Sequence, residues 1–163
     1  MSYQVQSLSP EDTLSIGRHL GKILRGGDVL CLIGDLGAGK TALAKGIGEA
    51  LAVAEPMTSP TFTYMQEYDG TAQGQPTRLI HMDLYRLQHP EEVEAIGIED
   101  AFQNDAICLI EWPEIAVDYL PKERLELRIE GSGEEPRKLS FFPFSQNWQE
   151  RMLNIWENLS SAI

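Results

Sequence analysis

One segment of the sequence has residue types and spacing that could bind a phosphate chain. Residues 34–41 read Gly-Asp-Leu-Gly-Ala-Gly-Lys-Thr. Gly37 and Gly39 can adopt backbone angles that other residues avoid, so that successive amide groups can point at phosphate oxygens. The Lys40 side chain can reach the terminal phosphates, and the Thr41 hydroxyl can bind a magnesium ion. The pattern therefore predicts a phosphate-binding loop.

Such a loop also needs an acidic side chain to hold the metal through water and to orient the nucleophile. Two acids end strand-like runs: Asp83 ends the run 79–83, and Glu111 ends the run 108–111. In open α/β sheets, ligands collect at the carboxyl ends of strands. We therefore predict that Asp83 and Glu111 are catalytic, and leave open which of them positions the attacking water. The alternative role for either acid is a salt bridge.

Three further side chains have two interpretations each. Thr61, in Ser-Pro-Thr at 59–61, could sense a terminal phosphate or belong to an ordinary turn. His81 could act as a base or ligand, although a lone strand histidine is more often structural. Trp112 could stack on a base or a partner, or it could be a core aromatic. The predicted nucleotide contacts are Asp35, Leu36, Gly37, Ala38, Gly39, Lys40, Thr41, Thr61 and Trp112.

A phosphate-binding loop requires a strand before it and a helix after it. Asp28–Ile33 is a compact apolar run typical of a buried strand, and Thr41–Leu51 has the apolar spacing of a helix. Ser9 and Pro10 favour the start of an earlier helix, as its N-cap and first residue. The other expected elements are strands at 4–8, 62–68, 77–83, 106–110, 125–130 and 137–142, and helices at 90–96, 98–102 and about 146–163.

Two hairpin signals decide the type of sheet. Residues 69–76 and residues 131–136 are rich in turn residues and each lie between two expected strands. These pairs predict a mixed sheet rather than a purely parallel one. Together with the strand–loop–helix unit they predict a P-loop NTPase-like α/β fold with helices flanking the sheet. Since no composition break divides the 163 residues, we expect one domain over 1–163.

The charge of the chain is strongly negative. The formal net charge is −12 at pH 7. Residues 1–56 carry five basic and six acidic side chains, whereas residues 57–163 carry eight and nineteen. Such a surface repels a phosphate backbone, so we do not expect the chain alone to bind RNA or DNA tightly.

The sequence start does not resemble a secretory signal, and the longest apolar runs, 29–33 and 106–110, are too short to cross a bilayer. We therefore expect a soluble, cytoplasmic protein without membrane contact. Cys31 and Cys108 lie inside apolar runs and outside any CxxC motif, so we interpret them as buried packing residues.

The nucleotide is less clearly encoded than the loop. The sequence has no Asn-Lys-x-Asp segment to read guanine, so ATP is the default. A small-molecule kinase is one alternative, but it should carry an arginine-rich lid. After Lys45 the next arginines are Arg78 and Arg86, which form no such segment. A binding module that is gated by nucleotide without turnover is another alternative.

Four blocks, in order, resemble one known family. They are GDLGAGKT at 34–41, SPTF at 59–62, HMDLYR at 81–86 and LIEWPE at 109–114. The set closely resembles the bacterial TsaE (YjeE) family, the small ATPase of tRNA threonylcarbamoyladenosine biosynthesis, over nearly the whole chain. The second and third blocks are much more specific to that family than the glycine loop.

The resemblance implies a function that composition does not. Members of this family bind ATP and Mg²⁺, hydrolyse ATP slowly alone, and act with two partner proteins that modify the tRNA adenosine beside the anticodon. By this resemblance, tRNA is reached only through those partners, and neither DNA nor a membrane is expected. Lys40 and Thr41 match the family's phosphate and metal positions. Glu111 matches its metal-side acid, and Asp83 its H-x-D acid.

Overall fold

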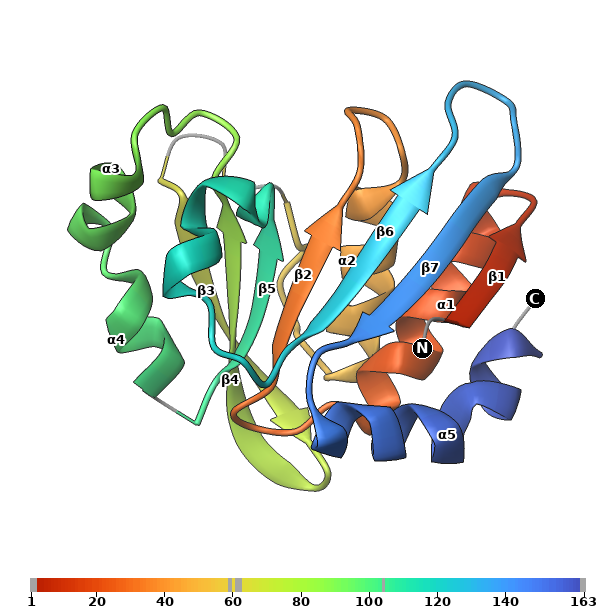
Figure 1. The fold of residues 1–163 in the computed structure, drawn as a ribbon. Helices are drawn as coiled ribbons and strands as arrows, with labels where there is room; N and C mark the ends of the chain where they lie inside the picture. Colours follow the sequence, from red (N-terminus) through yellow and green to blue (C-terminus); the bar gives the residue numbers. More distant parts are fainter. Residues whose placement is uncertain (1–2, 59, 61–62, 104, 162–163) are drawn as a thin grey trace.

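A computed structural model describes residues 3–58, 60, 63–103 and 105–161, and a seven-stranded mixed sheet lies at its centre (Figure 1). The strands are β1 Tyr3–Ser7, β2 Val29–Ile33, β3 Met65–Ala72, β4 Gln75–Asp83, β5 Ile107–Glu111, β6 Leu125–Glu130 and β7 Arg137–Pro143. The helices are α1 Pro10–Ile23, α2 Lys40–Ala50, α3 Pro90–Ala95, α4 Ile98–Gln103, the 3₁₀ helix η1 Pro113–Tyr119 and α5 Gln146–Ser160.

The sheet combines a parallel centre with antiparallel edges, in the order β1-β7-β6-β2-β5-β4-β3. Strand β2 is parallel to both of its neighbours, β5 and β6, and β4 is parallel to β5. Strands β3, β7 and β1 pair antiparallel with their neighbours. The predicted mixed α/β sheet is therefore confirmed. Because the central strands run the same way, their carboxyl ends meet at one edge, which is where the glycine loop begins.

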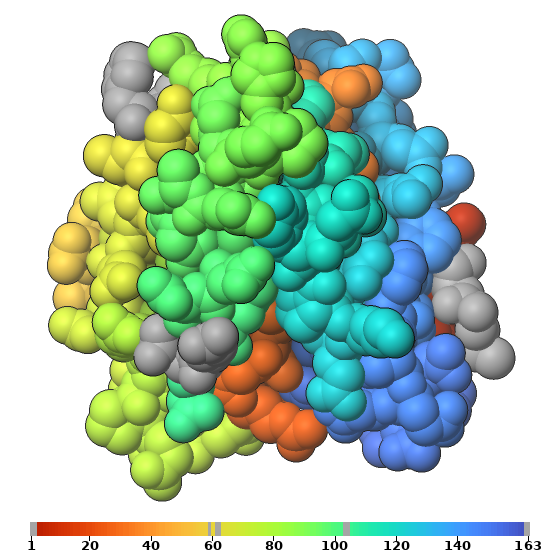
Figure 2. Space-filling model, turned by 60° about the vertical axis from the view of Figure 1, so that its left-hand side comes forward, coloured from red at the N-terminus to blue at the C-terminus, as the bar shows by residue number. Residues whose placement is uncertain are grey.

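The two faces of the sheet are covered by different helices. Helices α1, α2 and α5 pack on one face, where the predicted stripe of α5 buries Trp148, Met152 and Leu159. Helices α3 and α4 with η1 cover β5, β4 and part of β2 on the other face. Figure 2 shows these helices side by side at the surface on that side of the molecule. Cys31 and Cys108 lie in this second core, and burial raises the pKa of each thiol to about 12. Both are thus packing residues, as expected.

The N-terminal helix begins where the sequence predicts. The Asp12 amide donates a hydrogen bond to Ser9 Oγ at 3.1 Å, and Pro10 is the first helical residue.

Most other elements lie within three residues of their expected bounds. The main departure outside the strands is η1, which sequence periodicity missed because a 3₁₀ helix of seven residues shows little of it. No helix in the described part of the chain has the length and apolar composition that crossing a bilayer needs.

The first hairpin is tighter than expected. The sequence favoured a long connection over 69–76, but β3 and β4 extend through it and only Gln73 and Gly74 form the turn, with φ of 52° and 76°. Two residues with positive φ match the sheet twist at a hairpin. The Thr71 amide faces away from its partner Pro76 and donates to Leu51 O at 2.6 Å. Thr71 and Pro76 therefore form a non-hydrogen-bonded pair of the ladder, in which the N–H that proline lacks is not needed. The expected strand start at Phe62 lies outside the described residues.

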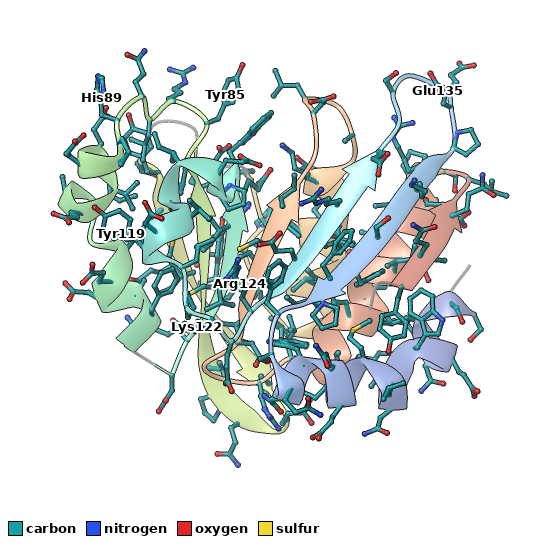
Figure 3. The ribbon with its side chains drawn as sticks, viewed as in Figure 1. Tyr85, His89, Tyr119, Lys122, Arg124 and Glu135 are labelled. Atoms are coloured by element: carbon teal, nitrogen blue, oxygen red, sulfur yellow. The ribbon has the colours of Figure 1, made fainter. Side chains whose placement is uncertain are left out.

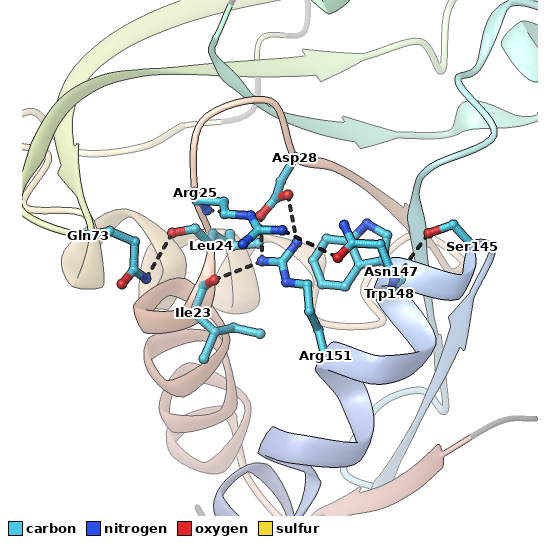
Figure 4. Close-up of polar contacts among 9 residues, drawn as sticks. All are labelled: Ile23, Leu24, Arg25, Asp28, Gln73, Ser145, Asn147, Trp148 and Arg151. Atoms are coloured by element: carbon cyan, nitrogen blue, oxygen red, sulfur yellow. Dashed lines mark hydrogen bonds and ion pairs between the residues drawn. The ribbon is translucent and has the colours of Figure 1, made fainter.

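A buried ion pair fastens α5 to the start of β2 (Figure 4). Both terminal nitrogens of Arg151 donate to the carboxylate of Asp28 at 2.8 Å, and Nη2 also donates to Ile23 O at 2.9 Å. The guanidinium lies 3.8 Å from the ring centroid of Trp148. The Arg25 amide donates to the same carboxylate. The strand that leads into the glycine loop is therefore held at its amino end by a C-terminal helix.

We expect Arg151→Met to lower the free energy of unfolding by about 3 kcal/mol, because it leaves the buried Asp28 carboxylate without its cation. Urea denaturation measures the loss. The control is Arg18→Met, which breaks an exposed ion pair with Glu49 and should cost less than about 1 kcal/mol. Equal and small losses in the two variants would show that the Asp28 pair contributes nothing.

Candidate functional site

The glycine loop joins β2 to α2 with the backbone conformation that its sequence predicts. Gly37 and Gly39 have φ of 80° and 114°. The loop is closed by a turn in which the Ala38 amide donates to Asp35 O at 3.1 Å. Gly39 is the N-cap of α2, so the positive end of the helix dipole faces the loop. This geometry suits a bound anion.

Lys40 is buried at the base of the loop, with only 6% of its surface exposed. Its Nζ donates to Gly34 O at 2.6 Å and lies 3.8 Å from the ring centroid of Trp112. Burial lowers the pKa of Lys40 below its ordinary value, and the nearby carboxylates of Glu111 and Asp83 oppose that shift. The ammonium is therefore held between the loop, an aromatic ring and two acids.

The two strand-end acids are neighbours. Asp83 and Glu111 are paired in the register of β4 and β5, so their side chains leave the sheet on the same face. The Leu84 amide donates to Glu111 O at 3.1 Å, and the Tyr85 amide donates to Asp83 Oδ1 at 3.0 Å. Glu111 is buried, whereas Asp83 is partly exposed. The carboxylates thus share one edge of the sheet but differ in their access to water.

The side chain of His81 forms a buried hydrogen bond with the side chain of Glu111. The two side chains are 2% and 4% exposed, and Nε2 of His81 donates to Oε2 of Glu111 at 2.6 Å. Nδ1 of His81 is buried and has no hydrogen-bond partner among the described residues. His81 does not line the cavity beside the loop. The histidine is therefore a buried partner of an acid, which favours the structural one of its two interpretations.

Trp112 forms one wall of the site rather than part of the core. It has φ and ψ of 56°, a left-handed conformation that is uncommon for an aromatic residue and all the more so before a proline, here Pro113. One neighbour of its ring is Lys40, and another is Tyr85, at a centroid distance of 4.8 Å. Tyr85 is 52% exposed, so the three side chains form a stack from the surface to the loop.

These side chains enclose a first cavity of about 250 Å³ at the carboxyl edge of the sheet. Its lining is Leu36, Gly37, Gly39, Lys40, Thr41, Asp83, Glu111 and Trp112. Of the other predicted contacts, Asp35 lies beside β6 on the outer side of the loop, and Ala38 is buried. Thr61 lies outside the described residues. The structure therefore brings eight of the predicted site residues together around one space.

A second cavity, of about 380 Å³, adjoins the first. Gly37 and Gly39 belong to both. The other residues that line it are Ser7, Leu8, Ser9, Pro10, Thr13, Ala38, Ala42, Gly133, Glu134, Glu135 and Arg137. It lies between the start of α1 and the β6–β7 turn. Figure 3 shows Tyr85 and Glu135 at the same edge of the sheet, on opposite sides of the glycine loop.

A family model described as threonylcarbamoyl adenosine biosynthesis protein TsaE matches residues 7–139. The chain belongs to the TsaE family. A Bacillus subtilis protein named tRNA threonylcarbamoyladenosine biosynthesis protein TsaE is 39% identical over 137 residues, which cover 83% of the chain and 82% of the relative. A relative of the same name from Streptomyces coelicolor is 38% identical over 138 residues, which cover 82% and 91%. The crystal structure of Bacillus subtilis YdiB matches with a TM-score of 0.76 and 32% identity, covering 98% of this chain and 95% of that one.

Sequence reasoning missed the second cavity of this TsaE-family chain. Ser9 and Pro10 were interpretable as a helix start and nothing more, and Arg137 as the first residue of an expected strand. The signals are weak because two of the walls, residues 7–13 and 133–137, are at least 120 residues apart, and the pairing of β1 with β7 brings them together. No local spacing encodes that approach.

The first cavity has donors of the kind that magnesium prefers. Thr41 offers a hydroxyl and Asp83 and Glu111 offer carboxylates to the same space. The described residues contain no cluster of three or more His, Cys, Asp or Glu side chains able to hold a metal ion. The donor set therefore fits a magnesium ion that completes its shell with phosphate oxygens and water, which is the usual arrangement beside a nucleotide.

Proposed function

We propose that this TsaE-family chain binds ATP with Mg²⁺ and hydrolyses it slowly, and that it acts with partner proteins in forming threonylcarbamoyladenosine on tRNA. One observation carries the proposal: a glycine loop, its lysine and threonine, and two strand-end carboxylates line a single cavity. The role in the tRNA modification is supported by the family and by the names of relatives from several bacteria.

In this proposal the triphosphate lies along the glycine loop. Lys40 contributes a positive charge to the terminal phosphates, and Thr41 binds the magnesium ion through its hydroxyl. When bound, Mg²⁺ neutralises the charge that develops on the phosphate oxygens. The Trp112 ring, 3.8 Å from Nζ of Lys40, covers the ammonium on one side of the cavity.

The two acids have separate roles in the proposal. Glu111 is buried and fixed by His81, which suits an acid that must hold metal-bound water in one place. Asp83 is more open, which suits an acid that orients an attacking water molecule. The difference in exposure supports this division of roles, which the sequence left undecided.

The second cavity suits the nucleoside. It shares Gly37 and Gly39 with the phosphate cavity, and Leu8, Pro10 and Ala42 give it apolar walls. A base that enters it would remain connected to phosphates that lie on the loop. This arrangement supports a complete nucleotide as the ligand rather than inorganic phosphate.

Two measurements test the proposal. Calorimetry with ATP and GTP, with and without Mg²⁺, should give the tightest binding for ATP with Mg²⁺. Phosphate release by the purified chain should be slow and should rise when the partner proteins are added. Transfer of phosphate to an added small molecule would indicate a kinase instead, and binding without any phosphate release, even with partners, would indicate a nucleotide-gated binding module.

We expect the isolated chain to bind tRNA weakly, because a net charge of −12 repels a polyanion. Titration of labelled tRNA at moderate salt measures this, and submicromolar binding would contradict the proposal.

In the same preparation, partner proteins should stimulate ATP hydrolysis. Arg86→Ala should reduce the stimulation while ATP affinity stays unchanged, because 84–86 flanks the first cavity and is proposed to contact the partner. Hydrolysis that is indifferent to partners would count against the assignment.

A further inference from the structure

Arg137, the first residue of β7, is bonded to backbone carbonyls on two loops. Its Nε donates to Ala38 O at 3.0 Å and its Nη2 to Gly37 O at 3.3 Å, both in the glycine loop. Nη2 also donates to Gly133 O at 3.0 Å, and Nη1 donates to Glu135 O, both in the β6–β7 turn. A guanidinium presents its donors in a rigid planar fork, so these bonds fix the two loops relative to each other.

These bonds set the direction of a peptide group that the phosphate site uses. In a trans peptide the carbonyl and the following amide point in opposite directions, and the described chain has no cis peptides. With Ala38 O turned toward Arg137, the amide of Gly39 points away from Arg137, and Gly39 lines the first cavity. We propose that Arg137 is a positioning residue for phosphate binding, which holds the Ala38–Gly39 peptide with its amide toward the phosphates.

Electrostatics supports the same assignment. The Ala38–Gly39 peptide dipole lies between a cation on its carbonyl side and the proposed phosphates on its amide side, so both charges favour one orientation. Without Arg137 the peptide could rotate, and a carbonyl directed at a phosphate would repel it. The inference rests on the proposed nucleotide binding, and it adds a residue from outside the glycine loop to that site.

The β6–β7 turn is shaped to place Arg137 there. Gly131 has φ of 129°, and a Cβ at this position would lie 2.9 Å from Cδ of Arg137 and 2.7 Å from Pro136 O. Gly34, the first residue of the glycine loop, packs so closely on β6 that a Cβ would lie 2.8 Å from Ile129 O. The glycine loop thus packs directly on the backbone of β6 at Gly34 and Ile129. Arg137 joins the same loop to the β6–β7 turn through its hydrogen bonds to Ala38 and Gly133. A larger residue at 131 would displace it.

The test compares Arg137→Met with the control Lys138→Met. Methionine keeps most of the apolar stem of Arg137 and removes the donors. Lys138, the next residue of β7, forms an exposed ion pair with Glu130, with 3.7 Å between Nζ and Oε1. Its partner is thus on β6 and not in the glycine loop. Calorimetry with two probes, ATP with Mg²⁺ and inorganic tripolyphosphate with Mg²⁺, separates the phosphate site from the nucleoside site. Melting temperatures show that each variant is folded.

We expect Arg137→Met to weaken the binding of both probes about tenfold or more, and Lys138→Met to leave both within about twofold. Unchanged tripolyphosphate affinity in folded Arg137→Met would overturn the inference, since Arg137 would then act only on the nucleoside cavity that it also lines. If Arg137→Met does not fold, Arg137→Gln replaces it. Its shorter, neutral amide supplies neither the positive charge nor the fork of donors, so tripolyphosphate binding equal to wild type would overturn the inference equally. Failure of the wild-type chain to bind ATP would instead refute the proposed function.

Discussion

Glu111→Gln is expected to bind ATP with near-normal affinity and to hydrolyse it about a hundredfold more slowly or worse. The amide keeps the shape of the carboxylate and can still bond to His81, so the fold around the strand end should persist. It lacks the negative charge that the proposed metal-side role requires, and one oriented electrostatic group commonly contributes about a hundredfold or more to a rate. Single-turnover phosphate release measures the rate, and calorimetry measures the affinity.

The matched control is Asp83→Asn, at the paired position of the next strand. If Asp83 orients the attacking water, this variant should also be slow, but its dependence on Mg²⁺ concentration should match that of the wild type. Glu111→Gln should require more Mg²⁺ for half-maximal activity. Near-normal turnover in Glu111→Gln together with an inactive Asp83→Asn would place both roles on Asp83.

Lys40→Ala is expected to weaken ATP binding by about ten- to a hundredfold, because it removes the cation proposed to meet the terminal phosphates. The protein should remain folded. What the change removes from the structure is one hydrogen bond to Gly34 and one contact with the face of Trp112, and it also removes the cost of burying a charge. Calorimetry and thermal melting test the two halves of this expectation separately.

Lys45→Ala is the control for that variant. Lys45 lies on the same helix, α2, but is exposed, so its removal changes the charge without changing the loop. Its ATP affinity should stay within about twofold of wild type. An affinity within about twofold of wild type in Lys40→Ala as well would contradict the proposed phosphate site. Equal and large losses in both variants would indicate that overall charge, rather than a placed ammonium, attracts the nucleotide.

The part of the site that the sequence predicted is the part encoded locally. The strand before the loop, Gly37, Gly39 and the start of α2 all lie within one short segment, where glycine geometry and helical spacing are decisive. Asp83 and Glu111 were predictable because strand ends share an edge in a parallel sheet. Their pairing in adjacent strands could not be known without the strand order.

The rest of the site depends on contacts between distant segments. Arg137 meets the glycine loop across about a hundred residues, and the second cavity needs β1 beside β7. No periodicity reports such contacts. The tight hairpin of β3 and β4 was misjudged for a different reason. Turn-forming residues occur inside its strands, and Pro76 is acceptable there only because it lies at a non-hydrogen-bonded position of the ladder, which depends on the register of the two strands.

The position of β2 in the sheet has a consequence for how the protein forms during synthesis. Val29 pairs with Cys108 and Leu30 with Leu125, so both neighbours of this strand are made 79 and 95 residues after it. Until β5 and then β6 have left the ribosome, the apolar strand that carries the glycine loop has two unpaired edges. Long loops must close before those pairings form, which slows folding and exposes strand edges to other chains. The nascent protein therefore cannot complete the proposed nucleotide site until nearly the whole chain has been translated, and aggregation during this interval is the risk that the topology imposes.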